Sequence, residues 1–124
     1  EIKRMTQWVV KELGPDVPMH FTAFHPDWKM LDVPATRPES LTRARQMALD
    51  NGVRYAYTGN VHDQKGESTY CHQCGELLIE RDWYVLGHWG LDDKGCCSKC
   101  GTRLAGVLES TPGTWGARRM PVAM

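Results

Sequence analysis

Four of the five cysteines in this sequence form two Cys-x-x-Cys pairs, Cys71 with Cys74 and Cys97 with Cys100. A glycine follows each pair, so each segment can make a tight turn that points two thiolates at one spot. Four thiolates suit a tetrahedral zinc ion and leave no coordination position open for a substrate. The spacing therefore predicts one metal site in a small ribbon, with structural zinc as its occupant.

Other chemistry is open to the same four sulfurs. Iron in this cage would make a rubredoxin-like one-electron carrier, and the spacing does not separate iron from zinc. A thioredoxin-like redox pair is disfavoured because such a pair occurs once, at a strand-to-helix turn. Cys96 lies one residue too far from Cys100 to complete a turn of this type, so we interpret it as a neighbour of the site.

Three aromatic residues, Trp83, Tyr84 and Trp89, lie between the two cysteine pairs. They could stack on nucleobases, as in a free-standing zinc ribbon that binds nucleic acid or protein, or they could form the core of the small module. The 15 basic residues balance the 15 acidic residues, so no bulk charge attracts nucleic acid or an anionic membrane. The zero net charge favours the core interpretation and argues against nucleic acid as a partner.

Polar side chains also follow two predicted strands, at the place where α/β proteins commonly bind ligands. A histidine beside proline and aspartate often only caps a loop or binds water, so this position identifies pocket candidates and no catalytic residue. The candidates are His20, His25, Asp27, Asn60 and His62.

The elements that would position these residues can be read from hydrophobic spacing. Apolar residues recur at helical spacing over residues 2–13, and Gly14-Pro15 ends that pattern. Residues 17–24 are largely apolar and predict a strand, which ends at His25-Pro26-Asp27 because proline removes a backbone donor.

A second helix is predicted to begin at Thr36, whose pairing with Glu39 fits a capping box, and to end at Gly52. Residues 53–58 then predict a second strand. Alternating helices and strands indicate parallel strands joined by crossover helices, and two strands are too few to bury both faces of such a sheet. We therefore predict that residues 1–62 belong to a larger α/β domain whose earlier strands lie upstream.

The ribbon follows this part of the chain. Residues 63–69 are polar and predict a linker, and residues 70–108 form the cysteine ribbon. Within the ribbon we expect a hairpin of residues 77–81 and 83–86 that turns near Arg81-Asp82.

The two ends of the chain carry no recognisable targeting signal. The first residues, Glu1-Ile2-Lys3-Arg4, lack the apolar core of a signal peptide and already have a helical pattern. No apolar run reaches the length needed to cross a membrane. We expect a cytoplasmic piece of a longer protein, with residues 109–124 as an extended or disordered tail of no assigned function.

Three segments of the sequence form a recognisable combination. They are Pro18-Met19-His20-Phe21-Thr22-Ala23-Phe24-His25-Pro26, Tyr55-Ala56-Tyr57-Thr58-Gly59-Asn60-Val61, and Thr69-Tyr70-Cys71 with Cys74-Gly75-Glu76-Leu77-Leu78-Ile79 and the second cysteine pair. Together they resemble the carboxyl-terminal end of the AmmeMemoRadiSam system radical SAM enzymes, which are similar to the pyruvate formate-lyase activating enzymes. The resemblance extends over most of the chain, roughly residues 17–107.

The resemblance implies that residues 1–62 are the last strands and helices of a partial (β/α) radical SAM barrel, with the ribbon after it. The full-length enzyme would hold a [4Fe–4S] cluster and cleave S-adenosylmethionine to a 5′-deoxyadenosyl radical. The resemblance does not identify its substrate, which is a protein or a small molecule. The five polar candidates would then lie in the S-adenosylmethionine or substrate pocket. The Cys-x-x-x-Cys-x-x-Cys motif of that cluster is absent here, so we expect this chain alone to be inactive.

Overall fold

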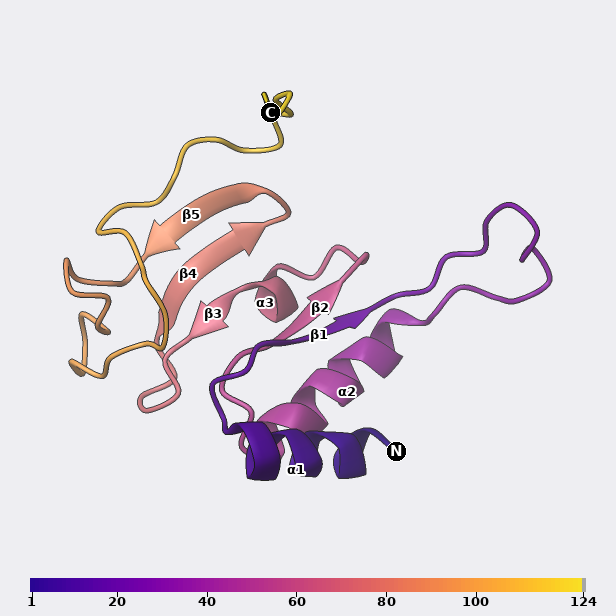
Figure 1. Cartoon of the computed structure of the whole chain (residues 1–124), viewed down its shortest axis with the longest axis horizontal. Coiled ribbons are helices and arrows are strands. Elements are labelled where there is room, and N and C mark those ends of the chain that lie inside the picture. Colours follow the sequence, from indigo (N-terminus) through magenta and orange to yellow (C-terminus); the bar gives the residue numbers. More distant parts are fainter. Residues whose placement is uncertain (124) are drawn as a thin grey trace. The chain divides into compact units, whose positions relative to one another are not determined.

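The computed structural model describes residues 1–123, which divide into two compact units. The first unit runs from Glu1 to Glu67, and the second begins at Ser68 (Figure 1). Among the described residues, no helix combines the length and the apolar character that a membrane crossing requires. We describe each unit by itself.

The first unit alternates helices and strands, as the sequence predicted. Strands β1 and β2 pair in parallel, with Met19 opposite Ala56 and Thr22 opposite Gly59, and helix α2 is the crossover between them. Two parallel strands are present here, so the barrel that the resemblance implies stays a prediction. The elements are α1 (Ile2–Leu13), β1 (Met19–Thr22), α2 (Pro38–Asp50), β2 (Ala56–Gly59) and α3 (Gln64–Glu67).

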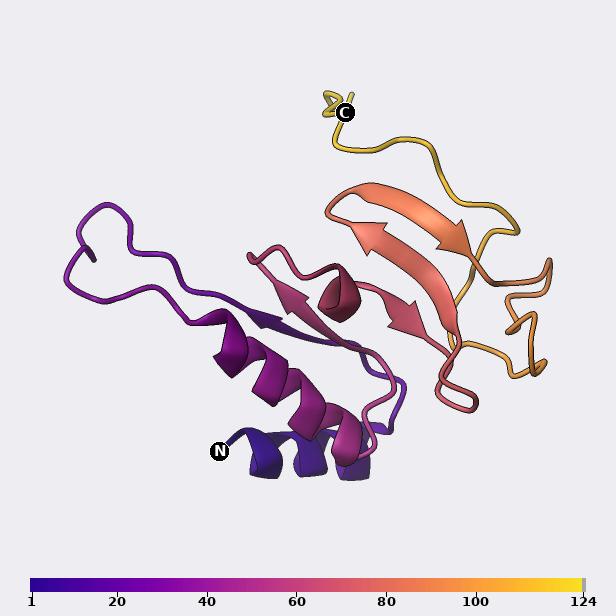
Figure 2. The ribbon, with the colours of Figure 1, turned by 180° about the vertical axis from the view of Figure 1, so that it is seen from behind.

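Helices α1 and α2 lie on the same side of the two strands in both views (Figures 1 and 2). Ala48 of α2 and Ala56 of β2 are buried together with Val53, and Val10 of α1 packs against this cluster. Met19 and Phe21 of β1 complete the cluster. Because side chains alternate along a strand, His20 and Thr22 face the opposite side of the sheet.

A partly buried polar contact joins α1 to the residue that follows α2. The Thr6 hydroxyl donates to the Ile2 carbonyl at 2.9 Å and accepts the Asn51 side-chain amide at 2.8 Å. Gly14 and Gly52, which the sequence marked as the helix ends, have φ values of 91° and 96°. Glycine adopts this left-handed conformation without the steric cost that a side chain adds.

The predicted capping box at Thr36 is wrong. Helix α2 begins at Pro38 with Arg37 as its N-cap residue, and no side chain caps it. Thr36 instead pairs with Phe24, whose N–H donates to the Thr36 hydroxyl at 2.9 Å and whose carbonyl accepts the Thr36 N–H at 3.0 Å. This tertiary contact closes the base of the loop between β1 and α2, so the hydroxyl is no longer available to the helix.

The predicted strands also begin too early. The parallel ladder starts where the Met19 N–H donates to the Tyr55 carbonyl at 2.8 Å, and Pro18 just before it has no N–H to donate. Arg54 is held outside the ladder by an ion pair with Asp16 at 3.0 Å. These contacts shorten β1 and β2 relative to the predicted ranges.

The predicted linker, residues 63–69, is structured. The Thr58 hydroxyl donates to Asp63, and a second carboxylate oxygen of Asp63 accepts the Gly66 N–H at 3.0 Å. These bonds hold the helical turn α3, so polar side chains here cap a turn and do not mark a flexible connection. The end of the same segment forms strand β3 (Thr69–Tyr70) of the second unit.

The second unit is a three-stranded antiparallel sheet in the order β3, β4 (Leu77–Asp82) and β5 (Val85–Trp89). Its core is aliphatic, with Leu78 and Ile79 buried together with Leu91 and Leu104. The hairpin exists as predicted, but its turn lies at Trp83-Tyr84 and not at Arg81-Asp82.

The core role that we predicted for the aromatic residues is wrong for two of them. Trp83 is 50% exposed and Tyr84 is 68% exposed, because both lie in the hairpin turn, where Trp83 has a φ of 55°. Trp89, at the end of β5, is partly buried.

The predicted extended tail contains no helix or strand over residues 109–123, and Met124 lies outside the described residues. It does contain one local turn, in which the Trp115 indole N–H donates to the Arg118 carbonyl at 2.7 Å.

Candidate metal centre

The first cysteine turn follows strand β3. The Cys71 N–H donates to the Glu76 carbonyl at 2.8 Å, and the Gly75 N–H donates back to the Cys71 carbonyl at 2.9 Å. Gly75 has a φ of 76°, which a residue with a side chain rarely adopts. These constraints curl the chain so that Cys71 and Cys74 face the same point.

The second turn repeats the first almost bond for bond. The Cys97 N–H donates to the Thr102 carbonyl at 2.8 Å, the Gly101 N–H donates to the Cys97 carbonyl at 2.8 Å, and Gly101 also has a φ of 76°. The Ser98 N–H donates to the Gly90 carbonyl at 2.9 Å, which ties this turn to the chain just after β5. The sheet thus fixes one turn at β3 and the other beyond β5.

The four sulfurs lie together as a tetrahedral site requires. Cys71 Sγ and Cys100 Sγ are 3.6 Å apart, Cys74 Sγ and Cys97 Sγ are 3.7 Å apart, and all four lie within 4.8 Å of one another. Zinc–sulfur bonds of about 2.3 Å in a tetrahedron give sulfur–sulfur edges of about 3.8 Å. The four cysteines therefore form a metal-binding site, and their chemistry and spacing fit zinc or iron.

The two turns place their ligands at different depths. Cys71 and Cys97, the first cysteine of each turn, are buried, whereas Cys74 and Cys100 are exposed. A metal ion bound here would therefore be held by two ligands from the core and two from the surface.

The pKa values of the two exposed thiols are shifted in opposite directions. Hydrogen bonds from the hydroxyl and the backbone N–H of Thr102 lower the pKa of Cys100 to about 6. At Cys74 a backbone hydrogen bond from Glu76 lowers the pKa, but desolvation and the neighbouring thiols outweigh it and raise the pKa to about 12. Four thiolates cannot accumulate side by side without a cation, so metal binding must release protons from this cluster.

Two further contacts stabilise the site from outside. Lys99 of the second turn forms an ion pair of 2.9 Å with Glu76 of the first turn, and the hydrogen bond to that carboxylate raises the pKa of Lys99. The Asp92 carboxylate accepts the N–H groups of Lys94 and Cys96, each at 2.9 Å, and these bonds lower its pKa. The sequence patterns did not indicate a role for Glu76, Asp92 or Thr102, although an aspartate two residues before Lys94 is a recognisable turn signal.

Cys96 takes no part in the sulfur cluster. It pairs with Arg103 in an isolated bridge, and its sulfur lies 4.0 Å from the Lys94 carbonyl. Among the described residues, the group with metal-ligand geometry consists of the other four cysteines. This agrees with the interpretation of Cys96 as a neighbour of the site.

The five pocket candidates are all exposed, and the structure connects two of them to the sheet. The His20 ring lies beside the Tyr57 ring, with centroids 5.1 Å apart, on the face that the helices leave open. The Asn60 side-chain amide donates to the Ala23 carbonyl at 3.3 Å, which links the carboxyl ends of β1 and β2. Asp27 accepts the Trp28 N–H at 2.8 Å, as a loop-capping residue does. A pocket that also includes His25 and His62 stays a prediction.

A comparison with curated proteins finds a similar protein in an archaeon. The chain is 45% identical over 102 residues to the uncharacterized protein MJ0808 of Methanocaldococcus jannaschii, and the match covers 82% of this chain. The chain spans 31% of the length of that relative. No protein-family model matches the chain, and no solved structure matches it.

Proposed function

We propose that the four cysteines bind one structural zinc ion, which holds the second unit together. The sulfur geometry supports this proposal, because four thiolates saturate a tetrahedral ion and leave it no open position for catalysis. The small aliphatic core of the unit, with Leu78 as its largest fully buried residue, also supports it. Small modules with little apolar core are commonly stabilised by a metal or by disulfides.

The test is elemental analysis with a visible spectrum, on protein purified without added metal, beside a Cys71→Ser and Cys97→Ser double variant. One zinc per chain that is absent from the variant would support a structural ribbon. A red, iron-containing protein with a reversible one-electron couple would favour a rubredoxin-like carrier, for which the exposed Cys74 and Cys100 offer a route to the surface. Protein without metal would contradict both.

We also propose that this chain is the carboxyl-terminal part of a longer, cytoplasmic radical SAM enzyme of the AmmeMemoRadiSam type. The three sequence segments that resemble this family support the proposal, and so do the parallel strands β1 and β2 with their crossover helix. A relative about three times as long as the matched region is consistent with a larger parent. The cluster and S-adenosylmethionine would be bound by that parent, because this chain lacks the cluster motif.

Reconstitution tests the activity. The protein as its gene encodes it is supplied with iron, sulfide, S-adenosylmethionine and a reductant, and 5′-deoxyadenosine is measured. Reductant-dependent formation of 5′-deoxyadenosine is expected, and its absence from protein that carries a reconstituted cluster would contradict the proposed activity.

A second candidate function is a zinc ribbon that binds protein or nucleic acid through its hairpin turn. The exposure of Trp83 and Tyr84 favours it, because such side chains can stack on a partner. Salt-dependent quenching of tryptophan fluorescence by single-stranded nucleic acid, lost in a Tyr84→Ala variant, would support this alternative.

A further inference from the structure

The outer edge of β1 carries backbone groups that have no partner within the part of the first unit that the structure describes. In a strand, successive residues direct their N–H and C=O groups to opposite edges. The Met19 N–H donates to the Tyr55 carbonyl at 2.8 Å, and the Ala23 N–H donates to the Gly59 carbonyl at 2.9 Å. His20 and Thr22 therefore direct their backbone groups away from β2, and both residues are exposed.

The outer edge of β2, unlike that of β1, already has contacts within the first unit. By the same alternation the Ala56 carbonyl points away from β1, and there it accepts the Arg45 guanidinium N–H at 2.9 Å. Helix α3 also packs against β2. A further strand can therefore pair with β1, because a new strand needs a free row of N–H and C=O groups.

The connections predict which kind of strand would be added at β1. Helix α1 leads into β1 and packs against the core formed by α2 and the strands, so both helices cover one face of the sheet. Crossovers between parallel strands are nearly always right-handed. A strand that precedes α1 would then lie beside β1, opposite β2, and parallel to both.

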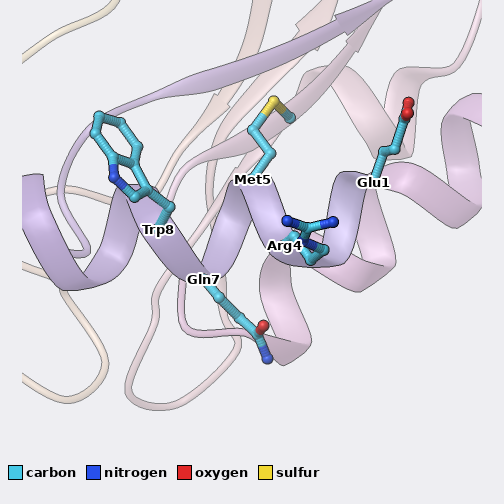
Figure 3. Close-up of a pocket in the computed structure, with 5 residues that line it drawn as sticks. All are labelled: Glu1, Arg4, Met5, Gln7 and Trp8. Atoms are coloured by element: carbon cyan, nitrogen blue, oxygen red, sulfur yellow. The ribbon is translucent and has the colours of Figure 1, made fainter.

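Helix α1 has an apolar flank that its contacts with α2 leave uncovered. Thr6 and Val10 face the core, whereas Met5 is 44% exposed and Trp8 is 58% exposed. Figure 3 shows Met5 and Trp8 projecting from one side of α1, and together with Glu1, Arg4 and Gln7 they line a shallow groove. An apolar flank of this kind fits the side of another helix.

We propose that the β1 edge and the Met5–Trp8 groove together bind one further helix–strand unit of a longer protein that contains this chain. The new strand bonds to His20 and Thr22, and the helix before it packs on Trp8. The length of the Methanocaldococcus relative favours such a segment over a second copy, because the chain spans 31% of that protein. The inference rests on the proposed longer parent, and it is independent of zinc and of radical chemistry.

Hydrogen–deuterium exchange tests the strand. The 124-residue chain is compared with the protein as its gene encodes it, at the amides of His20 and Thr22. We expect these amides to exchange at least about tenfold more slowly in the gene-encoded protein. The amides of Met19 and Ala23 are the control, because they are bonded to β2 in both. Equal, fast exchange of His20 and Thr22 in the two proteins would overturn the proposal.

A substitution tests the helix. Trp8→Glu should lower the Tm of the gene-encoded protein and leave that of the 124-residue chain nearly unchanged, with Tyr84→Glu in the exposed hairpin turn as a matched control. An equal effect of Trp8→Glu in both proteins would contradict the groove as an interface. Slow His20 exchange without S-adenosylmethionine cleavage would contradict the proposed activity and still support this interface.

Discussion

Cys96 and Cys97 are neighbours in the sequence with opposite environments. Cys97 is 1% exposed and its sulfur belongs to the metal cluster, whereas Cys96 is partly exposed and outside it. The difference comes from strand alternation at the bridge to Leu91, which turns one side chain into the core and the next away from it. This pair offers a matched comparison of a ligand and a bystander.

Replacing Cys97 with serine should abolish metal binding, and replacing Cys96 with serine should leave it intact. Because the binding free energy of a structural zinc ion, about 10–16 kcal/mol, is also folding free energy, the loss should unfold the second unit. Metal content after gel filtration and urea unfolding of both variants measure the effect. Metal loss in the Cys96 variant would assign that residue to the site.

Asp92 should help to hold the second turn through its charge. The pKa of Asp92 in the folded protein lies below its ordinary value of 3.8. The stability that the ionised carboxylate contributes is therefore fully present above pH 3.8 and is lost as the pH falls through the folded pKa. We therefore expect Asp92→Ala to speed metal transfer to a chromogenic chelator at pH 7. Asp92→Asn keeps the acceptor oxygen, so its rate of metal transfer should lie between those of Asp92→Ala and the native protein. Identical rates for all three proteins would show that the bonds to Lys94 and Cys96 do not restrain the turn.

Between β2 and β3, side-chain capping produces an element where composition predicted a linker. Asp63 bonds both to Thr58 and to the Gly66 N–H, and Gly66 fits closely beneath both side chains. A methyl group at Gly66 would collide with the Asp63 carboxylate and the Thr58 hydroxyl. The position of the helical turn therefore depends on the absence of a side chain.

Gly66→Ala should destabilise the first unit by about 1–3 kcal/mol, the usual cost of overpacking, although alanine is the better helix former by about 1 kcal/mol. Gly113→Ala is the control, because nothing lies within 4 Å of the methyl group that it adds. Urea unfolding followed by far-UV circular dichroism compares the two. A neutral Gly66→Ala variant would mean that the Asp63 cap can move aside.

At the scale of the whole molecule, the chain consists of two units with separate cores. Ala48, Val53 and Ala56 form the first core, whereas Leu78 belongs to the unit that carries all four metal ligands. Since the ligands stabilise one core only, metal removal should act on one unit only.

Chelation should therefore unfold the second unit and spare the first. We expect the amides of Leu78 and Ile79 to lose their protection from hydrogen exchange, while those of Ala44 and Ala48 in α2 keep it. Exchange measured by NMR before and after chelator addition tests this. Parallel loss of protection in both units would show that their stabilities are coupled.

The sequence by itself determined the features that depend on local spacing. The paired Cys-x-x-Cys turns, the helix ending at Gly14 and the parallel order of β1 and β2 were all predictable, because the interactions that define them are close in sequence or follow from alternation. The tertiary structure decided the rest. Thr36 bonds to Phe24 and does not cap α2, Trp83 lies in an exposed turn and not in the core, and the Arg45 guanidinium donates to the Ala56 carbonyl on β2. Each of these outcomes depends on a partner that the fold supplies from elsewhere in the chain, or on the exact residue at which a strand ends, and local patterns carry no information about either.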